Sequence, residues 1–196
     1  MARMVEEHPL PARIMHWIHL LCMGGLAISG WYIHRPFFEG GMGIMRWVHF
    51  ICMYVVLINL VARIYWAFLG AARDWHEFAL RPRDIRNTGK IVVYYLFIKR
   101  EHPEVGKYNP PQKLIYGWLW PLLLIFQAIS GFALYGPTAD YFAWFTVWVG
   151  GLAHVRLIHY MTMWAFIITV ALHVYLSLAE DFKSFLYMFF GVRPEE

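Results

Sequence analysis

The histidines are the residues of this sequence whose type and spacing indicate a chemical function. The chain of 196 residues has ten histidines, and five of them lie inside long apolar runs: His16, His19, His49, His159 and His173. Neutral imidazole is a common metal ligand, and an ionisable side chain inside an apolar run is a candidate functional residue. His159 and His173 are 14 residues apart, which on a helix is a rise of about 21 Å and a rotation about 40° short of four turns. Both imidazoles therefore leave nearly the same face of one helix, at different depths.

The composition indicates that these histidines belong to a membrane protein. The chain is 60% hydrophobic, 19% aromatic and 15% charged, whereas soluble domains are about half apolar and about a quarter charged. Cys22 and Cys52 both lie in apolar runs without CxxC or CxxCH spacing. The sequence therefore argues against a zinc ribbon, a thiolate-held iron–sulfur cluster and a covalent c-type haem.

Four apolar segments are long enough to cross a bilayer, which takes about 20 helical residues. They run over about 14–34, 47–69, 114–135 and 157–179. The sequence thus predicts an all-α integral membrane four-helix bundle that forms a single domain, 1–196. Pro121 is expected to bend the third helix, and three shorter apolar pieces are expected to be helices in the membrane interface: 91–98, 141–151 and 185–190. No cleavable signal peptide is expected, because the first apolar run is full length and lacks a small-residue cleavage site.

The distribution of positive charge predicts the orientation. Of the 17 lysines and arginines, only Arg35, Arg46 and Arg156 lie on one side of the predicted spans. Because positive charge favours the cytoplasmic side, we expect both termini and the 70–113 connection in the cytoplasm, in a multi-pass protein of the cell inner membrane. The net charge of +4 is then a topology signal and gives no reason to expect nucleic acid as a partner.

The orientation gives each histidine a depth in the membrane, and these depths pair the histidines across helices. His49 matches His159 near the outer surface, and His16 or His19 matches His173 near the inner surface. Haem b suits two such imidazoles, since its iron takes two axial ligands while the apolar porphyrin fills the space between helices. The sequence therefore predicts two haem b sites, one in each leaflet.

Three arginines support this prediction. Arg13, Arg46 and Arg156 each precede one of the histidines by three residues, which places a guanidinium on the same helix face one turn nearer the membrane surface. Haem propionates point toward that surface, and the arginine fork matches carboxylates. The same spacing favours His16 over His19 as the inner ligand, because only His16 has such an arginine.

Several motifs resemble a known family. They are RIMHW (13–17), RWVHF (46–50), RIYWAFLG (63–70), YNPPQ (108–112), SGFALYG (130–136), and HYMTMW with HVY and AED in the last span. They resemble the cytochrome b subunit of membrane-bound nickel–iron hydrogenases, in the cytochrome b561-like group that also holds the gamma subunits of formate dehydrogenases. The resemblance covers all four spans. It implies two b haems, with His16 and His173 on the cytoplasmic-side haem and His49 and His159 on the outer one.

The resemblance also implies a function. Electrons would enter from the iron–sulfur (small) subunit of a hydrogenase, which docks with its large subunit on the outer face near 141–151. They would pass from the outer haem to the inner haem and then to a quinone, either menaquinone or ubiquinone. Asn109 matches the asparagine of the family's quinone pocket and begins the third helix at the cytoplasmic interface. The chain would be an electron-transfer subunit with no catalytic centre of its own beyond this quinone site.

Three alternatives remain open at this stage. The same electron path could serve a formate dehydrogenase or a thiosulfate or polysulfide reductase. The chain could instead be a stand-alone membrane cytochrome, which co-purification would reveal. It could also be a non-redox anchor or a metal transporter, which predicts no haem spectrum.

Overall fold

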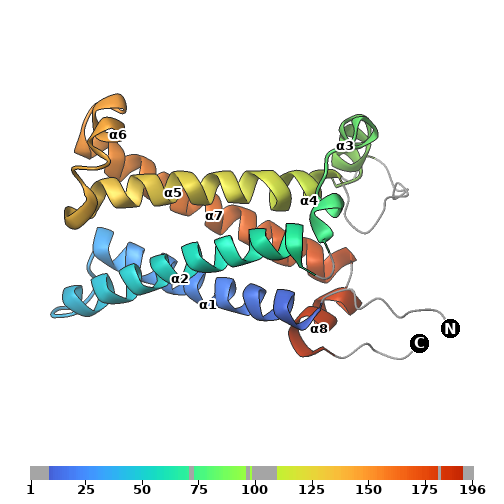
Figure 1. Ribbon diagram of the computed structural model, residues 1–196, viewed down its shortest axis with the longest axis horizontal. Helices are drawn as coiled ribbons and strands as arrows, with labels where there is room; N and C mark the ends of the chain where they lie inside the picture. The colour runs from blue at the N-terminus through green and yellow to red at the C-terminus, as the bar shows by residue number, and fades with distance from the viewer. Residues whose placement is uncertain (1–8, 71–72, 96–97, 99–109, 181, 192–196) are drawn as a thin grey trace. The chain divides into compact units, whose positions relative to one another are not determined.

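The protein is all-helical in the part of the chain that its computed structural model describes, residues 9–70, 73–95, 98, 110–180 and 182–191. The prediction of an all-α fold is therefore confirmed. The elements in chain order (Figure 1) are α1 (Leu10–His34), α2 (Met42–Leu69), η1 (Asp74–Glu77), α3 (Pro82–Tyr95), α4 (Pro110–Leu114), η2 (Ile115–Leu119), α5 (Trp120–Leu134), η3 (Gly136–Thr138), α6 (Ala143–Trp148), α7 (Leu152–Glu180) and α8 (Phe182–Phe190).

Four helical segments are long and apolar enough to cross a membrane, and they match the four predicted spans: Leu10–His34, Met42–Leu69, Pro110–Leu134 and Leu152–Leu178. Each begins four or five residues before the predicted start. Proline explains two of the early starts. Pro11 lies in the first turn of α1, and Pro110 begins α4, at positions where a helix needs no backbone N–H.

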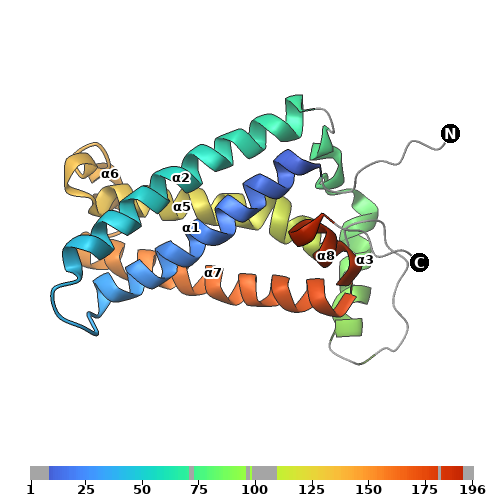
Figure 2. The same ribbon diagram turned by 90° about the horizontal axis from the view of Figure 1, so that it is seen from below.

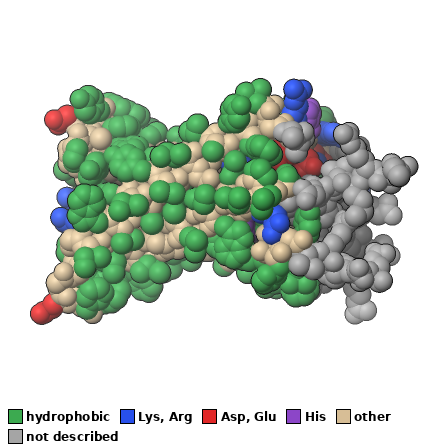
Figure 3. All heavy atoms as spheres, turned by 60° about the horizontal axis from the view of Figure 1, so that its bottom comes forward, with side chains coloured by type: hydrophobic (Ala, Val, Ile, Leu, Met, Phe, Trp, Pro, Cys, Tyr) green, Lys and Arg blue, Asp and Glu red, His purple; other side chains and the backbone are tan. Residues whose placement is uncertain are grey.

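The helices expose apolar side chains and bury small polar ones. Leu21, Ile58 and Val61 are 67–69% exposed, whereas Ser29 and Ser130 are fully buried. In Figure 3 hydrophobic side chains cover most of the visible face along the helices. An apolar surface of this extent is unstable in water, and polar side chains buried between helices are typical of membrane proteins.

A π-helical turn lies within the third span, just before Pro121, where a bend was predicted. The turn covers Ile115–Leu119, and the N–H of Trp120 donates to the carbonyl of Ile115. Proline lacks an N–H and its ring crowds the carbonyl four residues earlier. The wider turn accommodates the proline, and α5 continues from Trp120.

The chain divides into two compact units. Unit 1 contains residues 1–72 and 163–196, and unit 2 contains residues 73–162. In unit 1, α1 and α2 lie side by side (Figures 1 and 2). They approach closely at Gly25, where a Cβ would lie 2.9 Å from Sγ of Cys52. Cys22 and Cys52 are half-buried free thiols, as expected for packing residues.

The short helix α8 packs on the beginning of α1 within unit 1 (Figure 2). The ring of Phe189 meets Trp17 edge-on, with centroids 4.7 Å apart. The helix predicted over 185–190 is therefore found, with three more residues at its start.

Unit 2 has its own apolar core and an ion pair. Phe145 of α6 is buried with Ala133 at the end of α5, so the helix predicted over 141–151 is found as Ala143–Trp148. The prediction of a helix over 91–98 was wrong in its bounds: α3 begins at Pro82 and ends at Tyr95. Asp84 organises this earlier start: its carboxylate accepts the N–H of Arg81 at 2.9 Å and pairs with Lys113 at 3.1 Å.

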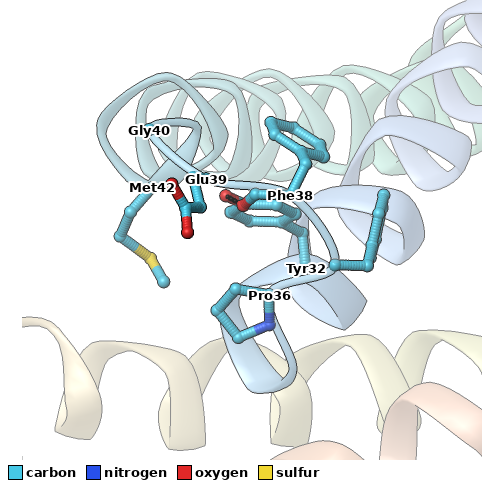
Figure 4. Close-up of a pocket in the computed structure, with 7 residues that line it drawn as sticks. Tyr32, Pro36, Phe38, Glu39, Gly40 and Met42 are labelled. Atoms are coloured by element: carbon cyan, nitrogen blue, oxygen red, sulfur yellow. Dashed lines mark hydrogen bonds between the residues drawn. The ribbon is translucent and has the colours of Figure 1, made fainter.

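The connection between α1 and α2 is held by Tyr32. Its hydroxyl donates to the carbonyl of Phe38 at 2.6 Å, and its ring packs against those of Phe37 and Phe38. Figure 4 shows the open pocket beside it, which Glu39 and Met42 also line. The pocket has no histidine in its lining, so it is not a candidate haem site.

Candidate functional site

His16 and His173 are brought together in unit 1, as predicted for the inner pair. Their ring centroids are 6.4 Å apart, with an angle of 59° between the ring planes. A metal held between two imidazoles needs centroids about 6 Å apart, because each metal–nitrogen bond is about 2 Å and each nitrogen lies about 1 Å from its ring centre. Nδ1 of His16 is buried and has no hydrogen-bond partner among the described residues. The pair thus has the spacing of two ligands to one metal.

Arg13, the predicted propionate partner of the inner site, contacts α8. Its Nε donates to the carbonyl of Met188 at 3.3 Å, and its guanidinium lies over the ring of Tyr187 at 5.9 Å. The last carbonyls of a helix attract cations, so Arg13 holds α8 against α1. Phe189 of the same helix meets the His16 ring edge-on at 6.0 Å and covers that side of the imidazole.

His19 has a different environment. Its Nδ1 accepts a hydrogen bond from the side-chain nitrogen of Asn59 on α2, and the same nitrogen donates to the carbonyl of Met15 at 2.8 Å. An asparagine oxygen in this position would face the carbonyl as a second acceptor, so the bond to Met15 fixes the amide orientation. His19 therefore joins α1 to α2. This role is compatible with the prediction that His16, and not His19, is the inner ligand.

His49 of α2 lies against Ser29 and Gly30 of α1. Nδ1 of His49 is 3.0 Å from Oγ of Ser29, and that hydroxyl also donates to the carbonyl of Gly25 at 2.5 Å. A Cβ on Gly30 would lie 3.2 Å from Cε1 of the same ring. The imidazole therefore rests on the backbone of the neighbouring helix.

His159 of α7 has the same surroundings in unit 2. Nδ1 of His159 is 2.8 Å from Oγ of Ser130, whose hydroxyl donates to the carbonyl of Gln127 at 3.0 Å. A Cβ on Gly131 would lie 3.2 Å from Cε1. The side-chain amide of Gln127 lies 3.2 Å from Nε2 of His159, while its oxygen is buried and has no hydrogen-bond partner in the described part of the chain.

Arg46 and Arg156, the other two arginines predicted for the site, lie near helix starts. Each is exposed and is the fifth residue of its helix, α2 or α7. Asn109 lies outside the described residues, one position before α4. Lys113, near this predicted quinone position, is engaged by Asp84.

The chain is similar to known proteins over nearly its whole length. A sequence model of the family described as prokaryotic cytochrome b561 matches residues 7–191. The chain is 32% identical to the probable Ni/Fe-hydrogenase 1 B-type cytochrome subunit of Escherichia coli K12, with 89% of this chain and 82% of the relative covered. The chain belongs to the prokaryotic cytochrome b561 family.

Two further relatives of the cytochrome have similar names. The probable Ni/Fe-hydrogenase B-type cytochrome subunit of Azotobacter chroococcum mcd 1 is 30% identical, with 92% of this chain and 82% of the relative covered. Its counterpart in Rhodobacter capsulatus is 28% identical, with 92% and 76% covered. Since the family is of b type, haem b is the cofactor implied for this cytochrome. With four candidate spanning helices, the cytochrome is a multi-pass membrane protein.

The residues present fit haem b. His16 and His173 have the spacing of axial ligands, and the orphaned Nδ1 of His16 lies inside the apolar packing of α1 and α8. The second histidine of α7, His159, and its counterpart His49 belong to different units. Nδ1 of each lies within hydrogen-bond distance of a serine hydroxyl, and metal-ligating histidines are commonly oriented by such a bond at the other ring nitrogen.

Four residues that contact these histidines were not predicted from the sequence: Ser29, Gly30, Ser130 and Gly131. A signal for them is present, because the tetrapeptide AISG occurs twice, at 27–30 and 128–131. Each copy lies on an apolar helix, and each contacts, on the neighbouring helix, one of the two histidines predicted for the outer haem. A search for short repeats between the first and third spans finds both copies.

Proposed function

We propose that this cytochrome is the di-haem membrane subunit of a respiratory hydrogenase and passes electrons to the quinone pool. The observation that carries the proposal is the pair His16 and His173, whose rings have the spacing of two ligands to one iron. The names of the relatives favour a hydrogenase as partner, because each is called a Ni/Fe-hydrogenase cytochrome subunit. No such observation favours a formate dehydrogenase, a thiosulfate reductase or a polysulfide reductase.

Four histidines would hold the two haems in this proposal. His16 and His173 serve the inner haem, and His49 and His159 serve the outer haem. Bound haem supplies one-electron carriage across the membrane. The protein contributes neutral imidazoles in fixed positions, together with apolar helices that keep water from the iron.

Three arginines would neutralise the haem propionates. Arg46 and Arg156 are exposed near the starts of their helices, where a carboxylate at the outer surface can reach them. Arg13 is engaged with α8, but a guanidinium has five N–H donors. Its Nη groups therefore still have donors for a carboxylate beside His16.

The proposed orientation puts hydrogen oxidation outside and quinone reduction inside. Both termini lie in the cytoplasm, and the protein lies in the cell inner membrane. The hydrogenase small iron–sulfur subunit and its large subunit dock at the outer end near α6. A quinone, menaquinone or ubiquinone, binds near Asn109 at the cytoplasmic end.

Haem stoichiometry in the purified subunit tests the proposal. Two pyridine haemochromes per chain, with hydrogen-dependent quinone reduction by the complex, are expected. His173→Ala should remove the inner haem and stop quinone reduction. The matched control is His154→Ala, which changes an exposed histidine on the same helix α7. One haem or none in the native chain would overturn the two-haem proposal, and purification with another oxidoreductase would overturn the hydrogenase partner.

A further inference from the structure

Two buried serines determine which nitrogen of each outer histidine carries its proton. Ser29 and Ser130 are fully buried, and each hydroxyl has one hydrogen to donate. Ser29 donates it to the carbonyl of Gly25, since two acceptors 2.5 Å apart would repel each other. Ser130 donates to the carbonyl of Gln127 at 3.0 Å.

It follows that each serine oxygen accepts from the histidine. Nδ1 of His49, 3.0 Å from Ser29, and Nδ1 of His159, 2.8 Å from Ser130, must therefore carry their N–H groups. A neutral imidazole protonated on Nδ1 has its lone pair on Nε2.

The adjoining glycines fix where each ring lies. A Cβ on Gly30 would be 3.2 Å from Cε1 of His49, and a Cβ on Gly131 would be 3.2 Å from Cε1 of His159. This separation is closer than ordinary contact, so an alanine there would press on the ring. The serine thus fixes the ring through a hydrogen bond, and the glycine lets the ring lie against the helix backbone.

We propose that the pairs Ser29–Gly30 and Ser130–Gly131 position the imidazoles of His49 and His159, one pair within each unit, and that the serine hydroxyls tune the reduction potential of the haem that these imidazoles would hold. This inference rests on the proposed ligands His49 and His159. An imidazole that donates Nδ1–H to an oxygen gives more electron density to the iron, which favours the ferric state. Loss of the hydroxyl should therefore raise the potential of the outer haem and leave the inner haem unchanged.

The test compares Ser29→Ala and Ser130→Ala in the purified holo-complex. Each should change the ferric-to-ferrous equilibrium of one haem by up to tenfold, which is about 59 mV for one electron. Each should also weaken retention of that haem about 10- to 100-fold, as expected for outer-shell partners. Ser29→Thr and Ser130→Thr keep the hydroxyl and should restore the native potential. The control is Thr88→Ala, which removes a hydroxyl that donates only along its own helix to the carbonyl of Asp84 at 2.8 Å.

The outcomes separate this inference from the proposed function. Two haems in the native chain, with unchanged potentials and haem retention in both alanine variants, would overturn the positioning role alone. Fewer than two haems in the native chain would overturn the proposed function. If an alanine variant does not fold, the threonine variant decides, because a shifted outer potential with the hydroxyl kept would contradict the inference.

Discussion

Asn59 offers the most direct test of how the inner ends of α1 and α2 are joined. The residue is 6% exposed, and its side-chain nitrogen donates to the carbonyl of Met15 and to Nδ1 of His19. Asn59→Leu keeps the size of the side chain and removes both donors. A buried acceptor that loses its donor costs about 1–3 kcal/mol. The Met15 carbonyl can keep its helical hydrogen bond and so loses less than the His19 nitrogen. We therefore expect the free energy of unfolding of Asn59→Leu to fall by about 2–4 kcal/mol.

The partner substitution is His19→Phe, and the double variant closes the cycle. When both members of a hydrogen bond become apolar, no buried polar atom is left without a partner. The double variant should therefore lose less stability than the two single variants together, with a coupling of about 0.5–3 kcal/mol. His154→Phe is the matched control, since it replaces an exposed histidine and should change little.

The assay is denaturant unfolding of the holo-protein in detergent, followed by far-UV circular dichroism, with haem counted in each variant. We expect the haem content to be unchanged throughout, because His16 and not His19 is the proposed ligand. Additive losses in the double variant would refute the coupling of Asn59 to His19. Loss of the inner haem in His19→Phe would refute the choice between the two histidines.

Arg13→Ala removes the hydrogen bond and the cation–π contact to α8, and should weaken the docking of that helix by about 1–2 kcal/mol; faster hydrogen exchange over 182–190 would show this. Lys113→Met removes the cation that pairs with the buried carboxylate of Asp84 and should cost about 3 kcal/mol of unfolding free energy, whereas an unchanged midpoint in denaturant would contradict the pairing. Asn109→Leu should slow quinone reduction at constant haem content, and an unaltered rate would remove Asn109 from the quinone site. In a potentiometric titration the outer haem should have the lower midpoint, because Nδ1 of His16 has no hydrogen-bond partner among the described residues; the reverse order would contradict this reasoning.

The four spans could be predicted because a bilayer requires a minimum length of apolar helix, and that length is visible in the sequence. Their first turns could not, since a proline such as Pro110 can begin a helix ahead of its apolar part. The polar beginning of α3 was missed for a related reason. A search for apolar runs finds 91–98, whereas the helix begins at Pro82 and is organised by the carboxylate of Asp84.

The inner histidine pair could be predicted from depth, helical phase and arginine spacing together. Depth left His16 and His19 as alternatives and the arginine spacing favoured His16, whose ring lies beside that of His173 in the structure. The role of Arg13 in holding α8 could not be predicted, because it depends on a helix 175 positions away along the chain. Ser29 and Ser130 were missed because a single serine hardly changes the hydropathy of an apolar helix.

Buried polar side chains connect the packing of the helices to the candidate ligands. Ser29, Asn59 and Ser130 are 0–6% exposed, and each bonds to a histidine of a neighbouring helix. Between apolar helices in lipid, a polar group without a partner is costly, so each bond holds two helices together while it orients an imidazole. Helix association and ligand orientation thus depend on the same interactions. A substitution at any of the three positions should therefore change both stability and the surroundings of a histidine, whereas a substitution on the lipid-facing surface should change neither.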